Sequence, residues 1–158
     1  MLRFAYLCDQ PHHIDQVTDW IYQEFIHNIK HDKDRTFIYN RYMKAKKAEL
    51  PIVLVALHKE RCVGTVSLVK NDLAGSKRTP WLSSLYVDQT CRGQGIGQKL
   101  VEEISCLAAS FGYDTLYLRT EHAGAYYLRL GWTGLEQLID EYGQQVQVFS
   151  RDLATSDG

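Results

Sequence analysis

The chain has 158 residues, a length typical of one domain, and its 45% hydrophobic and 23% charged residues exclude a disordered protein. Its 18 Lys and Arg residues stand against 19 Asp and Glu residues. The resulting net charge of −1 excludes the simplest class of nucleic-acid-binding protein, an overall basic domain. The sequence shows no signal segment and no run of the roughly 18 apolar residues that cross a membrane, so we expect a cytoplasmic protein with no membrane partner.

The first third of the chain predicts a strand and two helices. Residues 2–7 are mostly apolar and fit a strand, and Asp9-Gln10-Pro11 is typical of a helix start. The spacing that follows predicts a helix whose apolar face consists of Ile14, Val17, Trp20, Ile21 and Phe25. Residues 27–35 are polar and predict a loop. A weaker helix is predicted at about residues 36–47, with a buried face of Ile38, Tyr42 and Ala45.

The middle of the chain predicts three strands. Residues 52–57 and 62–69 are apolar or β-branched runs around a polar turn, which indicates a hairpin. Residues 81–87 form a third run, but Leu82 and Leu85 stand three positions apart and cannot share one face of a regular strand. A bulge at Ser83-Ser84 would bury both leucines.

The C-terminal half predicts the strongest helix of the chain, over residues 96–111, with Gly112 just past its end. A strand at 115–118, a short helix at 123–130 and a closing hairpin at 134–139 and 145–149 follow. No repeat or linker interrupts this order, so residues 1–158 are predicted to be one α/β domain. The four cysteines form no C-x-x-C pair, and we expect neither a metal site nor a disulfide framework.

A glycine-rich turn, Arg92-Gly93-Gln94-Gly95-Ile96-Gly97, connects the third of these strands to the strongest helix. Glycine lets a ligand approach the backbone, and the free N–H groups at a helix start attract anions, so the turn predicts a phosphate site. Neither of two common phosphate-binding motifs fits, because position 98 is glutamine: the dinucleotide fingerprint requires a small residue there, and the P-loop requires a lysine. The alternative is a glycine-rich connection that binds nothing.

Read as R-x-x-G-x-G, this turn resembles the pyrophosphate-binding motif of the GNAT superfamily of N-acetyltransferases. Residues 125–132 (AYYLRLGW) resemble the family's second signature, an aromatic-Tyr-x-x-x-Gly-aromatic segment, and residues 80–87 (PWLSSLYV) resemble a bacterial branch of the superfamily. The predicted elements from about residue 2 to residue 153 follow the family's order. The resemblance implies a mixed, mostly antiparallel twisted sheet that is flanked by about four helices and splayed at the bulged fourth strand.

The resemblance also implies acetyl-coenzyme A as the cofactor. The backbone of Leu85, Tyr86 and Val87 would pair with the pantetheine arm, and the pyrophosphate would bind the amides of Arg92, Gly93, Gln94, Gly95, Ile96, Gly97 and Gln98. Backbone amides bind phosphate without basic side chains, so a net charge of −1 is compatible with this cofactor. Arg92 would add positive charge, or it is a solvated turn residue. Many relatives carry asparagine where this chain has Thr120, whose hydroxyl could still bind the cofactor arm.

The second signature places the family's general-acid tyrosine at Tyr127, which would protonate the departing thiolate; the alternative is a packing aromatic beside Tyr126. The acceptor amine must lose a proton before it attacks. Glu121 and His122, near the end of the strand predicted at 115–118, are candidates for the catalytic base or a water relay, and Glu24, Glu49 and Asp72 are others; the sequence does not choose among them. Each of these side chains is alternatively a solvated surface group.

Charge is unevenly distributed along the chain. Residues 27–48 carry seven basic against two acidic residues, and residues 121–158 carry six acidic against two basic residues. Asp140 and Glu141 could attract a cationic amine, or they are ordinary solvated loop residues.

These observations predict an N-acetyltransferase that moves an acetyl group from acetyl-coenzyme A to a small-molecule or peptide amine, directly within a ternary complex. The alternative is a coenzyme A-binding sensor without catalysis. An interaction protein that uses the basic segment at residues 30–47 is disfavoured by the overall charge. The exposed hairpins make a homodimer plausible.

Overall fold

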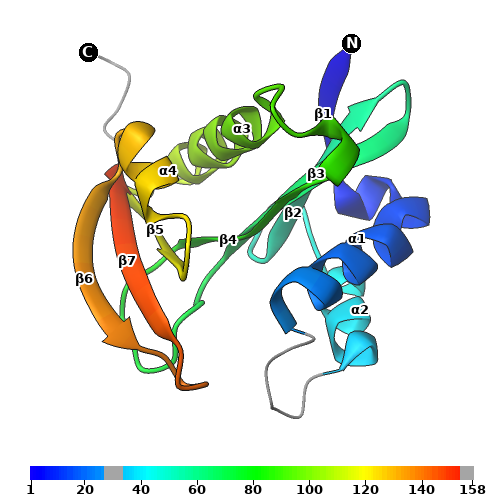
Figure 1. Ribbon diagram of the computed structural model, residues 1–158. Helices are drawn as coiled ribbons and strands as arrows, with labels where there is room; N and C mark the ends of the chain where they lie inside the picture. Colours follow the sequence, from blue (N-terminus) through cyan, green and yellow to red (C-terminus); the bar gives the residue numbers. More distant parts are fainter. Residues whose placement is uncertain (27–33, 154–158) are drawn as a thin grey trace.

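The computed structural model describes residues 1–26 and 34–153, which form one seven-stranded sheet with helices on both faces (Figure 1). The strand order is β1-β2-β3-β4-β5-β7-β6. The strands are β1 (Leu2–Tyr6), β2 (Ile52–His58), β3 (Arg61–Val69), β4 (Trp81–Val87), β5 (Thr115–Thr120), β6 (Thr133–Ile139) and β7 (Gln145–Asp152). The α-helices are α1 (Ile14–Ile21), α2 (Arg35–Met43), α3 (Ile96–Ser110) and α4 (Gly124–Arg129). All named strand pairs are antiparallel except β4 with β5, so the predicted mixed, mostly antiparallel sheet is confirmed.

The alternation of side chains along the central strands builds two cores. One face of β2 packs with α3 through Ile52, Leu54 and Ala56. The other face packs with α1 and α2 through Val53, Val55 and Leu57. Successive strand residues point to opposite faces, so a continuously apolar run is what a strand covered on both sides requires.

The N-terminal helix differs from its prediction at its C-terminal end. The α-helix stops at Ile21, and one π-helical turn, η3 (Tyr22–Ile26), continues it. The wider π turn rotates later residues around the axis, and Phe25 is 41% exposed instead of buried on the predicted face.

The second helix is shorter than predicted. Asp34 caps it by accepting a hydrogen bond from the Phe37 amide at 2.9 Å, so the helix starts at Arg35, within the segment predicted as a loop. Residues 27–33 of that predicted loop lie outside the described residues. The helix ends at Met43 because the chain then turns to pair with the sheet, where the Lys46 amide donates to the Pro51 carbonyl.

The predicted bulge in β4 is confirmed. Ser83 pairs with Ser67 and Tyr86 pairs with Thr65, so Ser84 and Leu85 together stand opposite a single β3 residue. Leu82 is buried, and Leu85 is partly buried against the same core. The extra residue therefore brings both leucines into the core, as the sequence requires.

Beyond the bulge, β4 and β5 diverge. Within the described residues the two strands pair only at Trp81 and Tyr117, so the sheet opens from this point onward (Figure 1). On the far side of the opening, β5 runs two residues further than predicted because Arg119 and Thr120 pair with β7. The predicted splay at the fourth strand is thus present, and the halves on either side of it are held together by this one strand pairing and by core side chains that both halves contribute.

Candidate functional site

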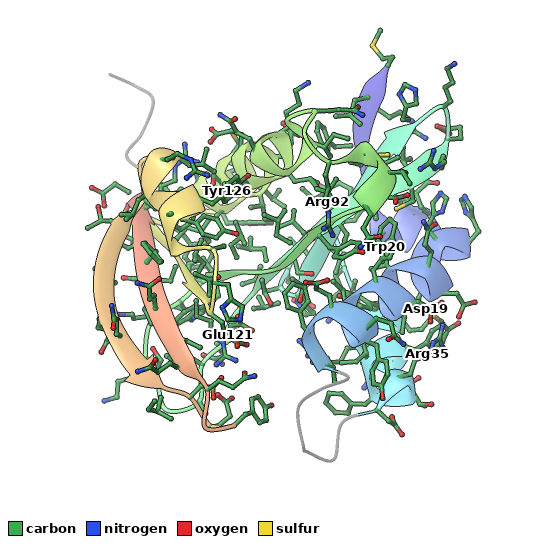
Figure 2. All side chains as sticks on the ribbon, in the orientation of Figure 1. Asp19, Trp20, Arg35, Arg92, Glu121 and Tyr126 are labelled. Atoms are coloured by element: carbon green, nitrogen blue, oxygen red, sulfur yellow. The ribbon has the colours of Figure 1, made fainter. Side chains whose placement is uncertain are left out.

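A cavity of about 1510 Å³ occupies the opening between β4 and β5. One wall comes from β4, the glycine turn and the start of α3, and the opposite wall comes from the end of β5 and from α4. The part below the sheet is closed by η3, α2 and the loop between β3 and β4. Figure 2 shows Arg92 and Trp20 on one side of the opening, and Glu121 and Tyr126 across from them.

The glycine turn leaves the N-terminus of α3 open. Gly93 and Gly95 have left-handed φ angles of +83° and +81°, and a Cβ atom at either position would meet nothing within 4 Å. Gly95 is the N-cap residue of α3 and no side chain caps this end, so the first-turn N–H groups remain available to an anion. At Gly97 a Cβ would lie only 3.3 Å from the Tyr126 hydroxyl, because α4 approaches α3 closely there.

Of the predicted turn residues, Gln94 is the one that does not line the cavity. Arg92 is exposed but anchored: its Nε donates to the Val87 carbonyl at 2.9 Å, and its guanidinium lies 5.1 Å from the centre of the Tyr86 ring. The Trp20 ring lies 5.2 Å from the same Tyr86 ring. The sequence places Trp20 on the buried face of a helix, and the structure agrees: Trp20 is partly buried against the core beside α1, where it also joins α1 to β4 through Tyr86.

The edge of β4 that faces β5 is open from the bulge to the glycine turn. Leu85, Tyr86 and Val87 line the cavity, and their pairing with β3 leaves the opposite edge of the strand toward the opening. The Val87 carbonyl is engaged by Arg92. This edge can therefore accept an extended ligand by strand-like hydrogen bonds.

Tyr127 projects from α4 into an aromatic cluster and also lines the cavity. Its ring centre lies 5.1 Å from that of Tyr126, 5.7 Å from Trp132 and 6.2 Å from Phe149. Burial raises the pKa of the Tyr127 phenol well above its ordinary value, so the hydroxyl keeps its proton at neutral pH. The side chain is thus both a packing aromatic and a protonated group at the cavity.

Thr120 ends β5 at the cavity wall. Its hydroxyl oxygen accepts a hydrogen bond from the Ala123 amide at 3.0 Å and so fixes the turn into α4. The hydroxyl hydrogen remains to be donated to a ligand.

The candidate bases lie in different surroundings. Glu121 lines the cavity with its side chain 38% exposed, 3.5 Å from the His122 ring, and Glu24 lines the cavity from η3. Glu49 does not line the cavity; it pairs with Lys46 on the surface, and that pairing lowers the pKa of its carboxyl.

Asp140 and Glu141 are bound to the protein itself. Arg119 lies 3.1 Å from Asp140 and 3.0 Å from Glu141. The buried Asp140 carboxylate also accepts from the Tyr142 and Gln144 amides, each at 2.9 Å. Asp140 is therefore neither an amine-binding group nor a solvated residue, because it holds the turn of the β6–β7 hairpin.

Asp72, in the loop between β3 and β4, lies in the cavity and accepts a hydrogen bond from the Ser83 hydroxyl at 3.2 Å. Desolvation raises the pKa of its carboxyl to about 6, while Arg119, Ser83 and Arg41 act in the opposite direction. No local pattern distinguishes this residue in the sequence, because the β4 bulge and the folding of the loop bring it to the site.

Among the residues that the structure describes, no group of three or more His, Cys, Asp or Glu side chains could hold a metal ion. Within the same residues, no helix has the length and apolar character needed to cross a membrane.

The sequence model of the acetyltransferase (GNAT) family matches residues 14–132 of the chain. No curated protein matches the chain significantly.

The fold is similar to those of several solved acetyltransferases. An aminoglycoside 6'-N-acetyltransferase complexed with coenzyme A shares 16% sequence identity and a TM-score of 0.77, over 99% of each chain. An acetyltransferase of the GNAT family from Staphylococcus aureus Mu50 shares 18% identity and a TM-score of 0.72, over 97% of this chain and 99% of that one. An N-acetylglutamate synthase from Neisseria gonorrhoeae, complexed with coenzyme A and N-acetyl-glutamate, shares 17% identity and a TM-score of 0.70, over 98% of this chain and 36% of that one. At these identities, the likeness establishes a shared fold.

Proposed function

Because the chain belongs to the acetyltransferase (GNAT) family, we propose that it transfers an acetyl group from acetyl-coenzyme A to a primary amine, directly within a ternary complex. The observation that carries this proposal is the uncapped N-terminus of α3, which opens into the same cavity as the protonated Tyr127. An anion site and a proton donor in one cavity are what the transfer requires.

The residues present fit coenzyme A. The first-turn amides of α3, together with the left-handed glycines at 93 and 95, would hold the pyrophosphate, and the anchored Arg92 would place its charge beside it. The β4 edge at Leu85–Val87, where Arg92 occupies the Val87 carbonyl, would bind the pantetheine arm, with the Thr120 hydroxyl as a donor on the opposite wall. When bound, acetyl-coenzyme A supplies the acetyl group as a thioester.

Tyr127 would act as the general acid. The transfer forms a carbon–nitrogen bond and breaks a carbon–sulfur bond, and the sulfur leaves with the electron pair of that bond. The Tyr127 hydroxyl would donate a proton to this sulfur. Its high pKa keeps the proton available at neutral pH.

The acceptor would be a cationic small-molecule or peptide amine. The cavity is lined by the acidic residues Glu24, Asp72, Glu121 and Glu141. Arg41 and Arg119 also line it, in addition to Arg92 at the proposed pyrophosphate site, and Arg119 is paired with Glu141. Glu121, which directly follows β5, is one of the candidate bases. The organisation as one domain, the cytoplasmic location, the homodimer and the absence of a nucleic-acid or membrane partner remain predictions.

Acetyl-coenzyme A binding is the first test. We expect acetyl-coenzyme A to raise the melting temperature of the purified chain in a saturable manner, because ligand binding stabilises the folded state. The absence of any shift at millimolar acetyl-coenzyme A would contradict both the transferase and the sensor.

Turnover is the second test. We expect amine-dependent release of free thiol with at least one member of a panel that includes kanamycin, spermidine, free amino acids and a peptide with a free N-terminus. Stabilisation by acetyl-coenzyme A without thiol release from any of these amines would favour the non-catalytic coenzyme A sensor.

A further inference from the structure

The bulge in β4 places two consecutive serine hydroxyls side by side. Successive residues of a strand normally point to opposite faces of the sheet. Ser84 has a φ of +56°, in the left-handed region that non-glycine residues rarely adopt, and this interrupts the alternation. As a result, the Ser83 and Ser84 hydroxyl oxygens lie 3.3 Å apart, and both residues line the cavity.

These hydroxyls lead to a carboxylate. The Ser83 hydroxyl donates to Asp72 Oδ1 at 3.2 Å, which makes a continuous path from Ser84 through Ser83 to Asp72. On the far side, the buried Tyr42 hydroxyl interacts with the hydroxyls of Ser84 and Ser67. These hydroxyls and the carboxylate therefore line the cavity next to the β4 residues proposed to bind the pantetheine arm.

We infer that Asp72 accepts the proton of the acceptor amine through the hydroxyls of Ser84 and Ser83. The inference rests on the proposed acetyl transfer and names the base of that reaction. The cationic amine first gives up a proton to the Ser84 oxygen, which frees the lone pair of the nitrogen to form the bond to the acetyl carbon. Ser84 passes its own hydroxyl proton to Ser83, and Ser83 passes its proton to Asp72. The carbon–sulfur bond breaks, the sulfur takes a proton from Tyr127, and the second proton that the nitrogen loses returns to the Tyr127 oxygen.

The surroundings of Asp72 suit a base at neutral pH. Arg119 on β5 and Arg41 on α2 face it and lower the pKa of its carboxyl, whereas burial and Glu141 raise that pKa. The balance leaves a carboxylate that is ionised at pH 7 and takes up a proton more readily than an exposed aspartate does. Glu121, by contrast, lies on the opposite wall, and its neighbouring partner is His122.

The left-handed backbone of Ser84 allows an experiment that distinguishes proton transfer by its hydroxyl from a purely structural role. Ser84→Gly removes the hydroxyl but suits the left-handed backbone, so the variant should melt at or above the wild-type temperature. Lys59→Gly is the matched control, because Lys59 also has a positive φ, +51°, and lies in the hairpin turn away from the cavity. We expect Lys59→Gly to melt no lower than wild type and to keep wild-type turnover. Ser84→Gly should lose at least about tenfold in kcat.

The pH profile of kcat tests Asp72 itself, with the panel amine that wild type acetylates fastest. Wild-type kcat should fall as the pH drops below about 6, the pKa of the Asp72 carboxyl. Asp72→Asn should lack this fall and should lose at least about tenfold in kcat at pH 7.5, with the KM for acetyl-coenzyme A within about twofold of wild type. Ser83→Ala, which interrupts the path in the middle, should behave in the same way.

The outcomes separate the two proposals. The proton path would be overturned if Asp72→Asn or Ser84→Gly kept the wild-type kcat. It would also be overturned if Glu121→Gln abolished the fall of kcat at low pH while Asp72→Asn retained that fall. These results would leave the proposed acetyl transfer in place. Failure of the wild-type chain to bind acetyl-coenzyme A would overturn the proposed function and the proton path together.

Discussion

Replacing Gly95 with alanine tests the anion site through the backbone alone. Gly95 has a φ of +81°, and a Cβ atom there meets nothing within 4 Å, so the change adds left-handed strain without a steric clash. Such strain costs about 1–2 kcal/mol for a residue with a side chain. For a chain of this length, a loss of 1 kcal/mol lowers the melting temperature by about 2–4 °C. We therefore expect Gly95→Ala to melt about 2–8 °C below wild type.

The same strain should weaken the binding of acetyl-coenzyme A. At a hundredfold excess over its Kd, a ligand stabilises the folded state by about 2.7 kcal/mol. If relaxation of the turn reorients the amides at the start of α3 and raises the Kd tenfold, about 1.4 kcal/mol of that stabilisation is lost. Thermal melts with and without acetyl-coenzyme A measure both effects on one sample. The ligand-induced rise should fall to about half of the wild-type value.

Gly112 provides the matched control at the other end of the same helix. Its φ is +89°, and a Cβ there also meets nothing within 4 Å. Gly112→Ala should therefore lower the melting temperature of the free chain by a similar amount and keep the full ligand-induced rise. The reasoning is refuted if Gly95→Ala keeps the full rise, or if both variants lose it equally.

Three further substitutions test the proposed general acid Tyr127, the buried Arg119–Asp140 ion pair and the raised pKa of the Asp72 carboxyl. Tyr127→Phe should lower kcat at least a hundredfold in a thiol-release assay, while the Kd for acetyl-coenzyme A changes little because the aromatic packing remains; unchanged kcat would remove the general-acid role. Arg119→Ala should destabilise the chain by about 3–5 kcal/mol in urea unfolding, because it leaves the buried Asp140 carboxylate without its cation; a loss under 1 kcal/mol would contradict that pairing. Burial raises the pKa of the Asp72 carboxyl in the folded chain, so ionisation of Asp72 costs stability as the pH rises from about 4 through about 6. Asp72→Asn should therefore unfold at higher urea than wild type at pH 7.5, by up to about 3 kcal/mol, with the difference vanishing near pH 4; an equal difference at both pH values would contradict this origin.

Local patterns were sufficient to predict the glycine turn and the bulge. The turn depends on residue types that few other conformations need, and left-handed Gly93 and Gly95 lie where the motif places them. The bulge followed from the odd spacing of Leu82 and Leu85, because two apolar residues three positions apart fit one core only if the strand gains a residue. These features are local, so periodicity and residue type carry the information.

The acceptor side of the cavity depends on contacts between distant segments. Asp72 was one of several carboxylates in the sequence, and its place beside Ser83 comes from how an irregular loop folds over β4. Trp20 has the spacing of a core residue and packs on the core beside α1, but its contact with Tyr86 joins two segments that are far apart in the sequence. Phe25 is exposed rather than buried because a π-helical turn interrupts the period of 3.6 residues, and the prediction of its burial assumed that period. No local pattern encodes these placements.

The single pairing of Trp81 with Tyr117 has a mechanical consequence. In a regular sheet, separating two neighbouring strands would break a ladder of hydrogen bonds, whereas here the described residues offer one paired position at the junction. The strands β1–β4 and the strands β5–β7 are instead held together by side chains, since one core cluster contains Leu82 of β4 and Leu118 of β5, and another contains Trp81 of β4 and Val148 of β7. The separation of the two cavity walls is therefore set by side-chain packing rather than by a ladder of backbone hydrogen bonds.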